Sequence, residues 1–389
     1  MMRRYILTGA TGVVGSAVLQ RLVNAREKTI ILIRAGSDDH LRQRTKALFR
    51  YCRFSGSARS LIQPVKADLI RPDLGLAGQD YDFLVRHATH MIHCAGNVTM
   101  NLPMGTALEQ TMRMTRNIIS LMESAGQIRK TEYVSTVGVA GDTPGPVREE
   151  WMLHERSFRN SYEAAKAEAE HFIREKRSQG RNITLHRPSM VIGNAATGET
   201  IRFQVFYYLC EFLSGARTLG LLPDLSGVFL DVVPSDYVAE LIYRASLETD
   251  NSPDVLHACS GPEHQLGLND LARRVRTLYK DSGFQVPGPI MLPTGLFQAL
   301  FRLTAIFAPP KTRRSLGTLP LFLKYLKTPQ HFINTRAREL AEQAGVRLPD
   351  AMTCALRSLG YYLDHKKNPG HPRRLPGKRR SHEIVYPRI

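Results

Sequence analysis

The segment that decides the fold is Tyr5-Ile6-Leu7-Thr8-Gly9-Ala10-Thr11-Gly12-Val13-Val14-Gly15. Its apolar start predicts a first β-strand, and glycines follow at every third position from Gly9 to Gly15. In nucleotide-binding α/β folds, the first such glycine allows a tight turn and the second lets the backbone approach a pyrophosphate. The third lets the next helix pack close to its strand. The segment therefore predicts a pyrophosphate-binding turn at the carboxyl end of the first strand.

Beyond this segment, strand-like and helix-like stretches alternate through the first half of the chain. Short apolar runs predict strands at 29–33, 62–66, 90–93, 131–135 and 184–186. Between them, apolar residues at helical spacing predict helices at 14–25, 39–49, 108–125 and 161–178. This alternation is typical of parallel βαβ units, so we expect an α/β fold with a Rossmann-type, doubly wound parallel sheet.

The alternation fades after Pro188, where Pro and Gly punctuate longer irregular stretches. We therefore expect a dinucleotide-binding domain over residues 1–190 and a smaller C-terminal substrate-binding region over residues 191–364. Two later strand-like stretches, 228–234 and 255–260, are expected to return to the main sheet. Such a return would interleave the two parts of the chain.

The formal net charge of the chain is +18 over 389 residues, which is unusually basic. Residues 365–389 contain eight Lys or Arg against one Glu, are rich in Pro and Gly, and lack apolar periodicity. That composition predicts a solvated, disordered tail, with contact to an acidic carrier protein or to anionic lipid as the alternative. Nucleic acid is not an expected partner, because no aromatic–basic interleaving or known binding motif accompanies the charge.

The five cysteines are scattered and show no CxxC pair or Cys/His ligand spacing. Neither a disulfide framework nor a metal site is therefore expected, and reduced thiols point to the cytoplasm. The first strand is expected within a few residues of Met1, which leaves no room for a signal peptide. The apolar stretch 295–308 contains Arg302 and is too short for a membrane span.

The sequence also predicts which dinucleotide the turn would bind. NAD-binding Rossmann proteins usually place Asp or Glu about twenty residues after the glycine turn, to hold the ribose hydroxyls. This chain has Arg34 there, with Arg42 and Arg44 on the following helix. Because a guanidinium suits a 2′-phosphate, we predict NADPH as the cofactor.

Further cofactor contacts are expected at the ends of the later strands. Asp68 and Leu69 follow the third strand, where such folds contact adenine, although Asp68 could equally cap a turn. Ala95, Gly96 and Asn97 follow the fourth strand, whereas His93 is expected to be a packed strand residue. The full predicted cofactor-binding set is Thr8, Gly9, Thr11, Gly12, Val13, Val14, Gly15, Arg34, Arg44, Asp68, Leu69, Ala95, Gly96, Asn97, Lys166, Pro188 and Ser189.

Three residues predict the catalytic chemistry. Tyr162 and Lys166 stand four apart in a segment of helix formers, which places both side chains on one helix face. A lysine ammonium and a nicotinamide charge nearby are expected to lower the tyrosine pKa from its usual value of about 10. Thr136 ends the preceding strand and can hydrogen-bond the same substrate oxygen. We therefore predict hydride transfer to a carbonyl carbon, with Tyr162 as the proton donor.

In this order, the glycine turn, Tyr133-Val134-Ser135-Thr136 and Tyr162-Glu163-Ala164-Ala165-Lys166 resemble an extended short-chain dehydrogenase/reductase. Further stretches are similar to the thioester reductase family, which includes fatty acyl-CoA reductases and terminal reductase domains of peptide synthetases. These stretches are 31–41, 67–76, 133–141, 186–193 and 257–262. The resemblance covers roughly residues 1–365 and leaves the basic tail outside.

The resemblance implies NADPH-dependent reduction of an acyl thioester to an aldehyde, sometimes onward to the alcohol. It implies Thr136, Tyr162 and Lys166 as the catalytic set. Terminal reductase domains usually follow a carrier domain, and this chain has no Gly-x-Asp-Ser carrier signature. The acyl group is therefore expected on CoA or on a separate acidic carrier protein, for which a basic surface is suited.

Other functions share parts of this machinery. A ketone or hydroxysteroid-type dehydrogenase and a sugar-nucleotide epimerase would use the same Tyr/Lys pair, although Arg34 disfavours the NAD that an epimerase retains. A non-catalytic dinucleotide sensor would not need the trio.

Two apolar stretches, 203–213 and 296–307, predict core helices or the lining of an acyl channel. Because Lys311, Arg313 and Arg314 follow the second stretch, peripheral membrane contact is an alternative there.

Overall fold

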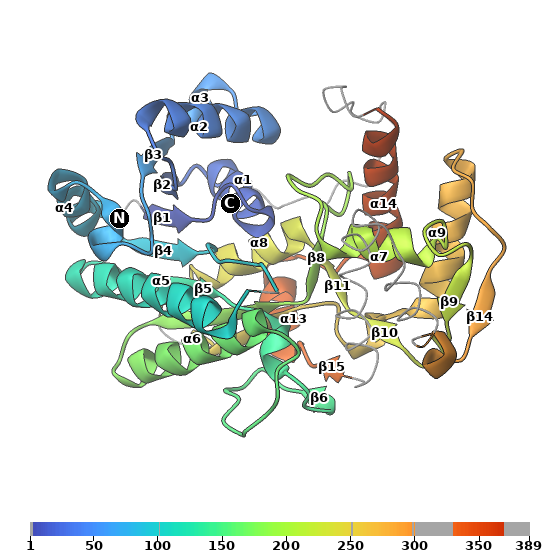
Figure 1. Cartoon of the computed structure of the whole chain (residues 1–389). Helices are drawn as coiled ribbons and strands as arrows, with labels where there is room; N and C mark the ends of the chain where they lie inside the picture. The colour runs from blue at the N-terminus through green and yellow to red at the C-terminus, as the bar shows by residue number, and fades with distance from the viewer. Residues whose placement is uncertain (1–2, 101, 250–251, 298, 300–329, 369–389) are drawn as a thin grey trace.

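A seven-stranded parallel sheet with the order β12-β7-β5-β4-β1-β2-β3 forms the centre of the molecule (Figure 1). The structure is a computed structural model that describes residues 3–100, 102–249, 252–297, 299 and 330–368. The strand order reverses between β1 and β4, and in folds of this type a dinucleotide binds at the carboxyl ends of the strands beside such a reversal (the cofactor edge). The α/β, Rossmann-type prediction is thereby confirmed.

The strands of this sheet lie close to where the sequence predicts them. They are β1 (Arg4–Thr8), β2 (Lys28–Ile33), β3 (Ile62–Lys66), β4 (His90–His93), β5 (Lys130–Val134), β7 (Ile183–Pro188) and β12 (Val255–Ala258). Most of their residues are buried, as expected of parallel strands covered by helices on both faces. The stretch 255–260 thus returns to the main sheet through β12.

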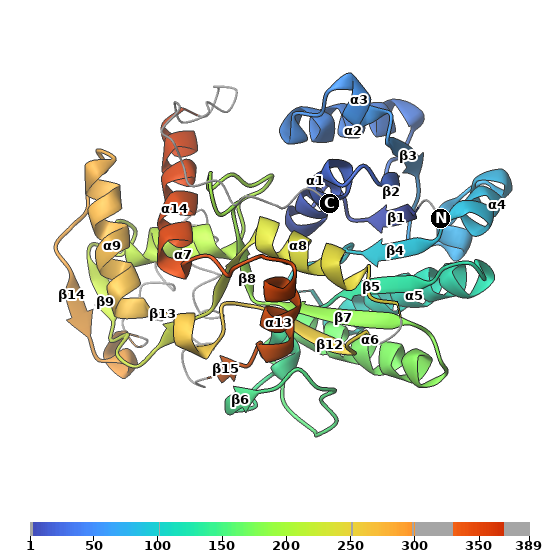
Figure 2. The ribbon, with the colours of Figure 1, turned by 180° about the vertical axis from the view of Figure 1, so that it is seen from behind.

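Two layers of helices cover the sheet. Helices α4 (Gly78–His87), α5 (Met104–Ser124) and α6 (Ser161–Ser178) pack on the face seen in Figure 1. Helices α1 (Val13–Asn24), α2 (Asp38–Cys52), α8 (Ser235–Ala245) and α13 (Thr335–Gln343) pack on the opposite face, in view in Figure 2. The short elements of this part are α3 (Gly56–Arg59), η1 (Pro72–Gly75), η2 (Val137–Ala140) and β6 (Gly145–Val147).

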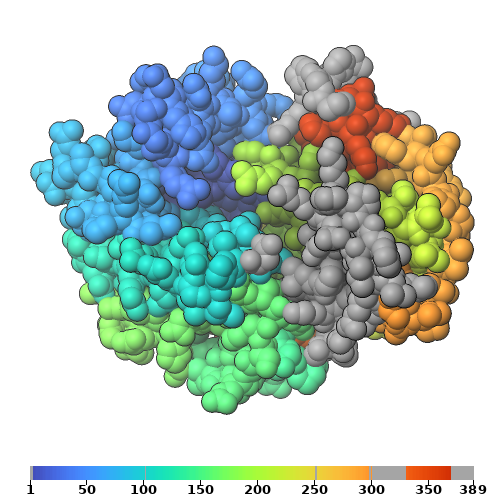
Figure 3. Space-filling view, in the orientation of Figure 1, coloured from blue at the N-terminus to red at the C-terminus, as the bar shows by residue number. Residues whose placement is uncertain are grey.

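A second hydrophobic core lies beside the sheet, at the right of Figure 1. Its elements are β8 (Met190–Ile192), α7 (Val205–Leu213), β9 (Leu221–Pro223), β10 (Phe229–Leu230), β11 (Val232–Pro234), η3 (Pro262–His264), β13 (Leu266–Gly267), α9 (Leu268–Asp281), β14 (Ile290–Leu292) and α14 (Ala351–Lys367). A short strand, β15 (Gln330–Phe332), pairs with β6. In Figure 3 this second core forms the yellow-to-red side of the molecule, next to the blue-to-green N-terminal side.

The prediction for 228–234 was wrong about the sheet that it joins. β10 pairs antiparallel with β13, and β11 pairs parallel with β8, so neither strand enters the main sheet. β8 begins two residues after β7 ends, and it carries the chain from the main sheet into this second layer. A strand of only two or three residues can hydrogen-bond its backbone N–H and C=O groups within such a small two-stranded ladder, so it does not need the main sheet.

Helix α14 ends at Lys367, so residues 365–367 are helical and the predicted tail starts later than the composition suggests. Residues 369–389 lie outside the described residues, and so does nearly all of the apolar stretch 296–307 with the basic residues after it. Among the described residues, no helix is long and apolar enough to cross a membrane.

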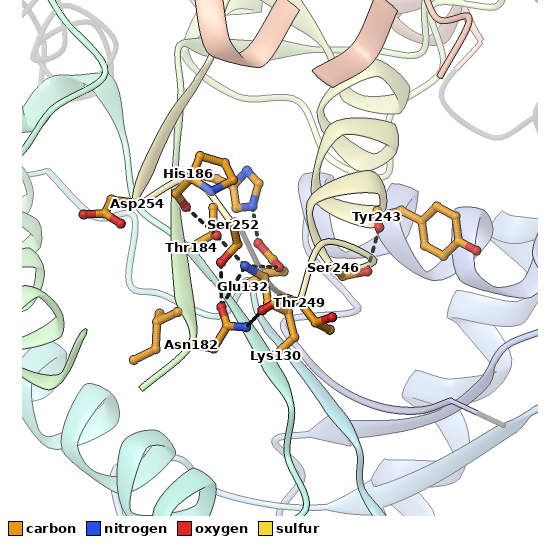
Figure 4. Close-up of polar contacts among 12 residues, drawn as sticks. Lys130, Glu132, Asn182, Thr184, His186, Tyr243, Ser246, Thr249, Ser252 and Asp254 are labelled. Carbon is orange, nitrogen blue, oxygen red and sulfur yellow. Dashed lines mark hydrogen bonds and ion pairs between the residues drawn. The ribbon is translucent and has the colours of Figure 1, made fainter. Parts of the chain in front are cut away.

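A polar network is buried between β5 and β7, from Lys130 at the start of β5 to His186, which pairs with Val134 at the end of β5 (Figure 4). Glu132 Oε2 and His186 Nε2 lie 2.6 Å apart, and Lys130 Nζ lies 3.6 Å from Glu132 Oε1. Lys130 also donates to Thr184 Oγ1 at 2.6 Å. Because the three ionisable side chains are fully buried, each depends on these partners rather than on water.

Candidate active site

The glycine turn has the geometry that the sequence predicts. Gly9 has φ +73°, and a Cβ on it would lie 2.6 Å from the Ala95 nitrogen. A Cβ on Gly15 would lie 2.1 Å from the Gly9 carbonyl oxygen, which is far inside contact distance. The Gly12 amide closes the turn by donating to that oxygen at 2.8 Å. Glycine is therefore required at Gly9 and Gly15 for the turn to lie against β4 and α1.

The amino end of α1 lies directly after this turn. Gly12 is its N-cap, and no side chain in the described part of the protein caps its first amides. Uncapped helical amides and the positive end of the helix dipole suit a pyrophosphate. The residues present thus fit a bound dinucleotide at this place, with Val13 and Val14 supplying backbone amides.

Thr8 connects the end of β1 to the end of β4. Its Oγ1 lies 2.9 Å from His93 Nδ1 and accepts a hydrogen bond from the Ala95 amide at 3.2 Å. Thr8 and His93 are both buried, and burial lowers the pKa of His93 to about 3, so the imidazole is neutral. His93 is therefore a packed strand residue, as predicted, and Thr8 fixes the turn against β4.

Guanidinium groups gather beside the turn. Arg44 on α2 donates to Thr11 Oγ1 at 2.8 Å and also to the Arg34 carbonyl oxygen. Burial, then the charges of Arg34 and Arg202, lower the pKa of Arg44. Within the described part of the chain, none of the three forms an ion pair with a carboxylate. A cluster of like charges without a counter-ion suits an anionic ligand.

Several other predicted cofactor residues hydrogen-bond to groups of the protein itself. Asp68 Oδ1 accepts from the Ile70 amide at 3.3 Å, which is the turn-capping alternative, and the Leu69 carbonyl accepts from Asn117. Asn97 bonds Gln110 and the Thr99 amide through its side chain. Ser189 follows Pro188 at the end of β7, and its amide donates to the Ala258 carbonyl oxygen at 3.1 Å. All four positions nevertheless lie at or just after the carboxyl ends of β3, β4 and β7.

Helix α6 is fixed at its first turn, where Tyr162 lies. Asn160 is the N-cap, and its Oδ1 accepts from the Glu163 amide at 3.0 Å. Glu163 reaches back to the Arg159 amide at 2.9 Å, and Ser161 Oγ donates to the Leu102 carbonyl at 2.8 Å. Reciprocal capping of this kind holds the entry of a helix in one position.

The structure brings Tyr162 to Thr136. The Thr136 side chain lies near enough to the Tyr162 hydroxyl to influence its pKa, and Thr136 Oγ1 accepts from the Gly138 amide at 3.1 Å. Burial raises the pKa of Tyr162 to about 12, and the Thr136 side chain opposes this only in part. The expected lowering of this pKa was therefore wrong for the protein side chains alone. A phenol that keeps its proton at neutral pH is suited to donate it.

Lys166 lies one helical turn further along α6 and is buried. Its Nζ donates to the Val134 carbonyl oxygen at 3.0 Å and lies 3.4 Å from where a Cβ on Gly96 would be. The ammonium thus lies between the ends of β4 and β5, beside the glycine turn. Burial lowers the pKa of Lys166 to about 8, and the charge of Glu170 opposes that shift.

This pKa predicts a pH dependence of cofactor binding. Lys166 is protonated below pH 8 and neutral above it, so its attraction for ribose oxygens and phosphates falls as pH rises through that value. We expect dinucleotide affinity to decline on the alkaline side with a midpoint near pH 8. Fluorescence titration of the dinucleotide from pH 6 to 10 measures it, with Lys166→Met as the control that removes the midpoint. A wild-type midpoint that survives in Lys166→Met would contradict this assignment.

Sequence reasoning missed two residues of this site. Arg202 had no predicted role, because it lies beyond the alternating strands and helices from which the cofactor contacts were predicted. It comes from the part of the chain that forms the second core. Tyr133 belongs to the motif that ends in Thr136 but had no predicted function, although its ring lies against Lys166. No local pattern signals either contact, since both depend on how distant segments pack.

The stretch 203–213, which was predicted to form either a core helix or the lining of an acyl channel, contains α7. Most of its apolar side chains are buried in the second core, which favours packing for that helix. All five cysteines lie in described segments and are free thiols.

Comparison with known proteins identifies the family. Residues 7–242, more than half of the chain, match the model of the male sterility protein family of NAD-binding domains. The non-reducing polyketide synthase dbaI of Emericella nidulans is 27% identical over 277 residues, which are 67% of this chain and 10% of that protein. The isonitrile lipopeptide synthase of Streptomyces coeruleorubidus is 28% identical over 252 residues, which are 63% of this chain and 16% of that protein. The chain thus spans a small part of the length of these relatives.

Solved structures show the same fold. The terminal R domain from the myxalamid PKS-NRPS biosynthetic pathway superposes with a TM-score of 0.79 at 23% identity, over 94% of this chain and 91% of that one. A thiolation-reductase di-domain from an archaeal non-ribosomal peptide synthetase superposes with a TM-score of 0.75 at 17% identity, over 94% of this chain and 76% of that one. The chain therefore belongs to the male sterility protein family, within the thioester-reductase-like branch of the extended short-chain dehydrogenases/reductases, and is an NAD(P)-dependent oxidoreductase.

Proposed function

We propose that this protein reduces an acyl thioester to an aldehyde with NADPH, with Thr136, Tyr162 and Lys166 as its catalytic residues. The observation that carries the proposal is the meeting of these side chains beside the glycine turn. The Tyr162 hydroxyl lies near Thr136, and Lys166 lies against Gly96, which follows the end of β4. The similarity to a polyketide synthase, a lipopeptide synthase and a terminal R domain supports a thioester as the substrate.

Bound NADPH would supply a hydride to the carbonyl carbon of the thioester. Thr136 orients the carbonyl oxygen, and Tyr162 donates its proton to that oxygen as negative charge develops on it. Collapse of the resulting hemithioacetal breaks the carbon–sulfur bond and releases the aldehyde and the thiol. Lys166 holds the ribose and supports the phenolate that Tyr162 becomes. A second reduction of the aldehyde, to the alcohol, would use the same groups.

The cofactor preference for NADPH rests on the guanidinium cluster. Arg34 and Arg44 lie next to the glycine turn, where the 2′-phosphate of the adenosine ribose belongs in this fold. Arg44→Gln removes a charged hydrogen-bond donor, which is worth about 1.5–3 kcal/mol. We therefore expect NADPH affinity to fall about 10- to 150-fold while NADH affinity changes little, because NADH lacks that phosphate.

Titration of both dinucleotides against wild type and Arg44→Gln measures this prediction. Arg113→Gln is the matched control, since Arg113 pairs with Glu109 on the exposed face of α5. Equal losses for NADPH and NADH in Arg44→Gln would refute a 2′-phosphate role.

The acyl donor is a carrier-protein thioester or an acyl-CoA. The archaeal structure joins a thiolation domain to its reductase domain, which favours a carrier-bound substrate for this chain. The net charge of +18 is also suited to an acidic partner.

Purified protein with NADPH and a defined thioester, supplied both on CoA and on a separate carrier protein, tests the function. We expect NADPH consumption with an aldehyde trapped as its hydrazone and identified by mass spectrometry. Turnover of ketones or sterols without turnover of either thioester would reject the proposal in favour of a ketone dehydrogenase. Binding of dinucleotide without any turnover would favour a sensor.

A further inference from the structure

The ammonium of Lys166 is buried beside few polar groups. Its side chain is almost wholly enclosed, and Nζ donates to the Val134 carbonyl oxygen at 3.0 Å. Among the described residues, no carboxylate lies within ion-pair distance of it. A buried charge is costly unless other groups compensate for the lost water, so a further stabilising group is needed.

The aromatic ring of Tyr133 lies in the position to stabilise the buried ammonium of Lys166. Lys166 Nζ lies 5.2 Å from the centroid of the Tyr133 ring, within the range of a cation–π interaction. Tyr133 is 1% exposed, so the interaction is desolvated and stronger than on a surface.

The ring itself is fixed on two sides. The Tyr133 hydroxyl lies 2.8 Å from Thr115 Oγ1 on α5, which holds the outer end of the ring. The His93 imidazole lies against it with the centroids 5.0 Å apart. The backbone of β5, the Thr115 hydroxyl and the neutral His93 imidazole thus fix the orientation of the Tyr133 ring.

We propose that Tyr133 is a positioning residue, whose ring face holds the ammonium of Lys166 at the cofactor edge and stabilises its positive charge. This inference rests on the proposed function, in which Lys166 binds the cofactor ribose. It assigns the ring, together with the Val134 carbonyl, as a partner of the charge before cofactor binds.

The other titratable groups around Lys166 do not replace the ring. Glu170, one turn along α6, raises the pKa of Lys166, but its carboxylate is bound by Arg187 at 2.6 Å. Cys94 on the β4 side is a thiol whose pKa burial raises to about 12, so it is neutral across the range of the test below. His93 is neutral as well, and Tyr162 keeps its proton.

The phenol of Tyr133 also stays neutral, because burial raises its pKa well above the usual value. Its attraction for the ammonium therefore comes from the negative face of the ring and not from a phenolate. That face is the partner that a substitution can test.

The test is a fluorination series at position 133 in the full chain, read by NADPH binding between pH 6 and 10. Tyr133→Phe keeps the ring face, whereas Tyr133→pentafluorophenylalanine keeps the shape and removes the negative face. Loss of a desolvated cation–π contact lowers the pKa of its cation by about one unit or more. We expect the alkaline midpoint to stay within about 0.3 unit in the Phe variant and to fall by about one unit in the fluorinated variant.

Thr115→Val removes the same hydroxyl–hydroxyl bond as Tyr133→Phe, so it is likewise expected to leave the midpoint within about 0.3 unit. Tyr133→Leu removes the ring altogether and should shift the midpoint at least as far as fluorination does. Because the fluorinated residue preserves size, a folding defect in Tyr133→Leu leaves the test intact.

Two failures can be told apart. A midpoint that Lys166→Met abolishes but that fluorination does not move would overturn the role of Tyr133 and leave the proposed function standing. A wild-type midpoint that Lys166→Met does not change would overturn the role of Lys166 and this inference with it.

Discussion

Replacing Tyr162 with phenylalanine is expected to lower thioester turnover by about 10²- to 10⁴-fold, the usual contribution of general acid catalysis. The variant loses only the hydroxyl that donates the proton, while the first turn of α6 keeps its Asn160 cap. NADPH affinity should therefore stay within about 3-fold, since Lys166 and the glycine turn remain in place. Stopped-flow reduction of a defined thioester gives the rate, and fluorescence titration gives the affinity.

The matched control is Tyr81→Phe. Tyr81 lies on α4, where its hydroxyl donates to Ser124 Oγ at the end of α5 at 3.4 Å, in an exposed contact. That variant loses the same atom and should retain full turnover. Full activity in Tyr162→Phe would refute the proton-donor role, and loss of NADPH binding in the same variant would indicate a structural role instead.

The main sheet could be predicted from the sequence because its strands carry strong local signals. β1 and β2 contain continuous apolar runs, and a glycine turn follows the first of them. The same holds for α6, whose predicted bounds at 161 and 178 match the structure. The carboxyl ends of parallel strands meet at one edge, so correct strands already place Thr136 and Gly96 near each other.

What the sequence could not supply depends on packing between distant segments. β10 and β11 are two and three residues long, and their partners β13 and β8 cannot be chosen from so few side chains. For the protein side chains alone, the predicted direction of the Tyr162 pKa shift was wrong, because spacing reveals the nearby lysine but does not reveal how deeply the phenol is buried. Arg202 reaches the cofactor edge from beyond residue 190 for the same reason.

The buried network behind the active site connects the stability of the fold to that edge. β5 carries Lys130 and Glu132 at its start and middle and ends just before Thr136. The Ser135 amide donates to the His186 carbonyl at 2.7 Å, so the strand that holds the network also leads directly to Thr136. Disrupting the network should therefore weaken both the sheet and the site (Figure 4).

Glu132→Gln is expected to destabilise the protein by about 3–5 kcal/mol, because it leaves the buried Lys130 charge without its carboxylate. Glu132 lies 2.6 Å from His186 and 3.6 Å from Lys130, and the side chains of all three are fully buried. Urea unfolding, followed by circular dichroism, measures the free energy of unfolding. Glu109→Gln is the control, because it breaks the exposed Arg113 pair and should cost about 1 kcal/mol or less.

The double variant Lys130→Met with Glu132→Leu then separates charge from packing. Replacing both buried charges by apolar groups of similar size is often close to neutral, so this variant should recover most of the stability that Glu132→Gln loses. If the double variant is as unstable as the single one, the network stabilises the fold through its hydrogen bonds to Thr184 and Asn182 rather than through charge compensation. If Glu132→Gln itself costs no more than the Glu109 control, the carboxylate does not stabilise Lys130 at all.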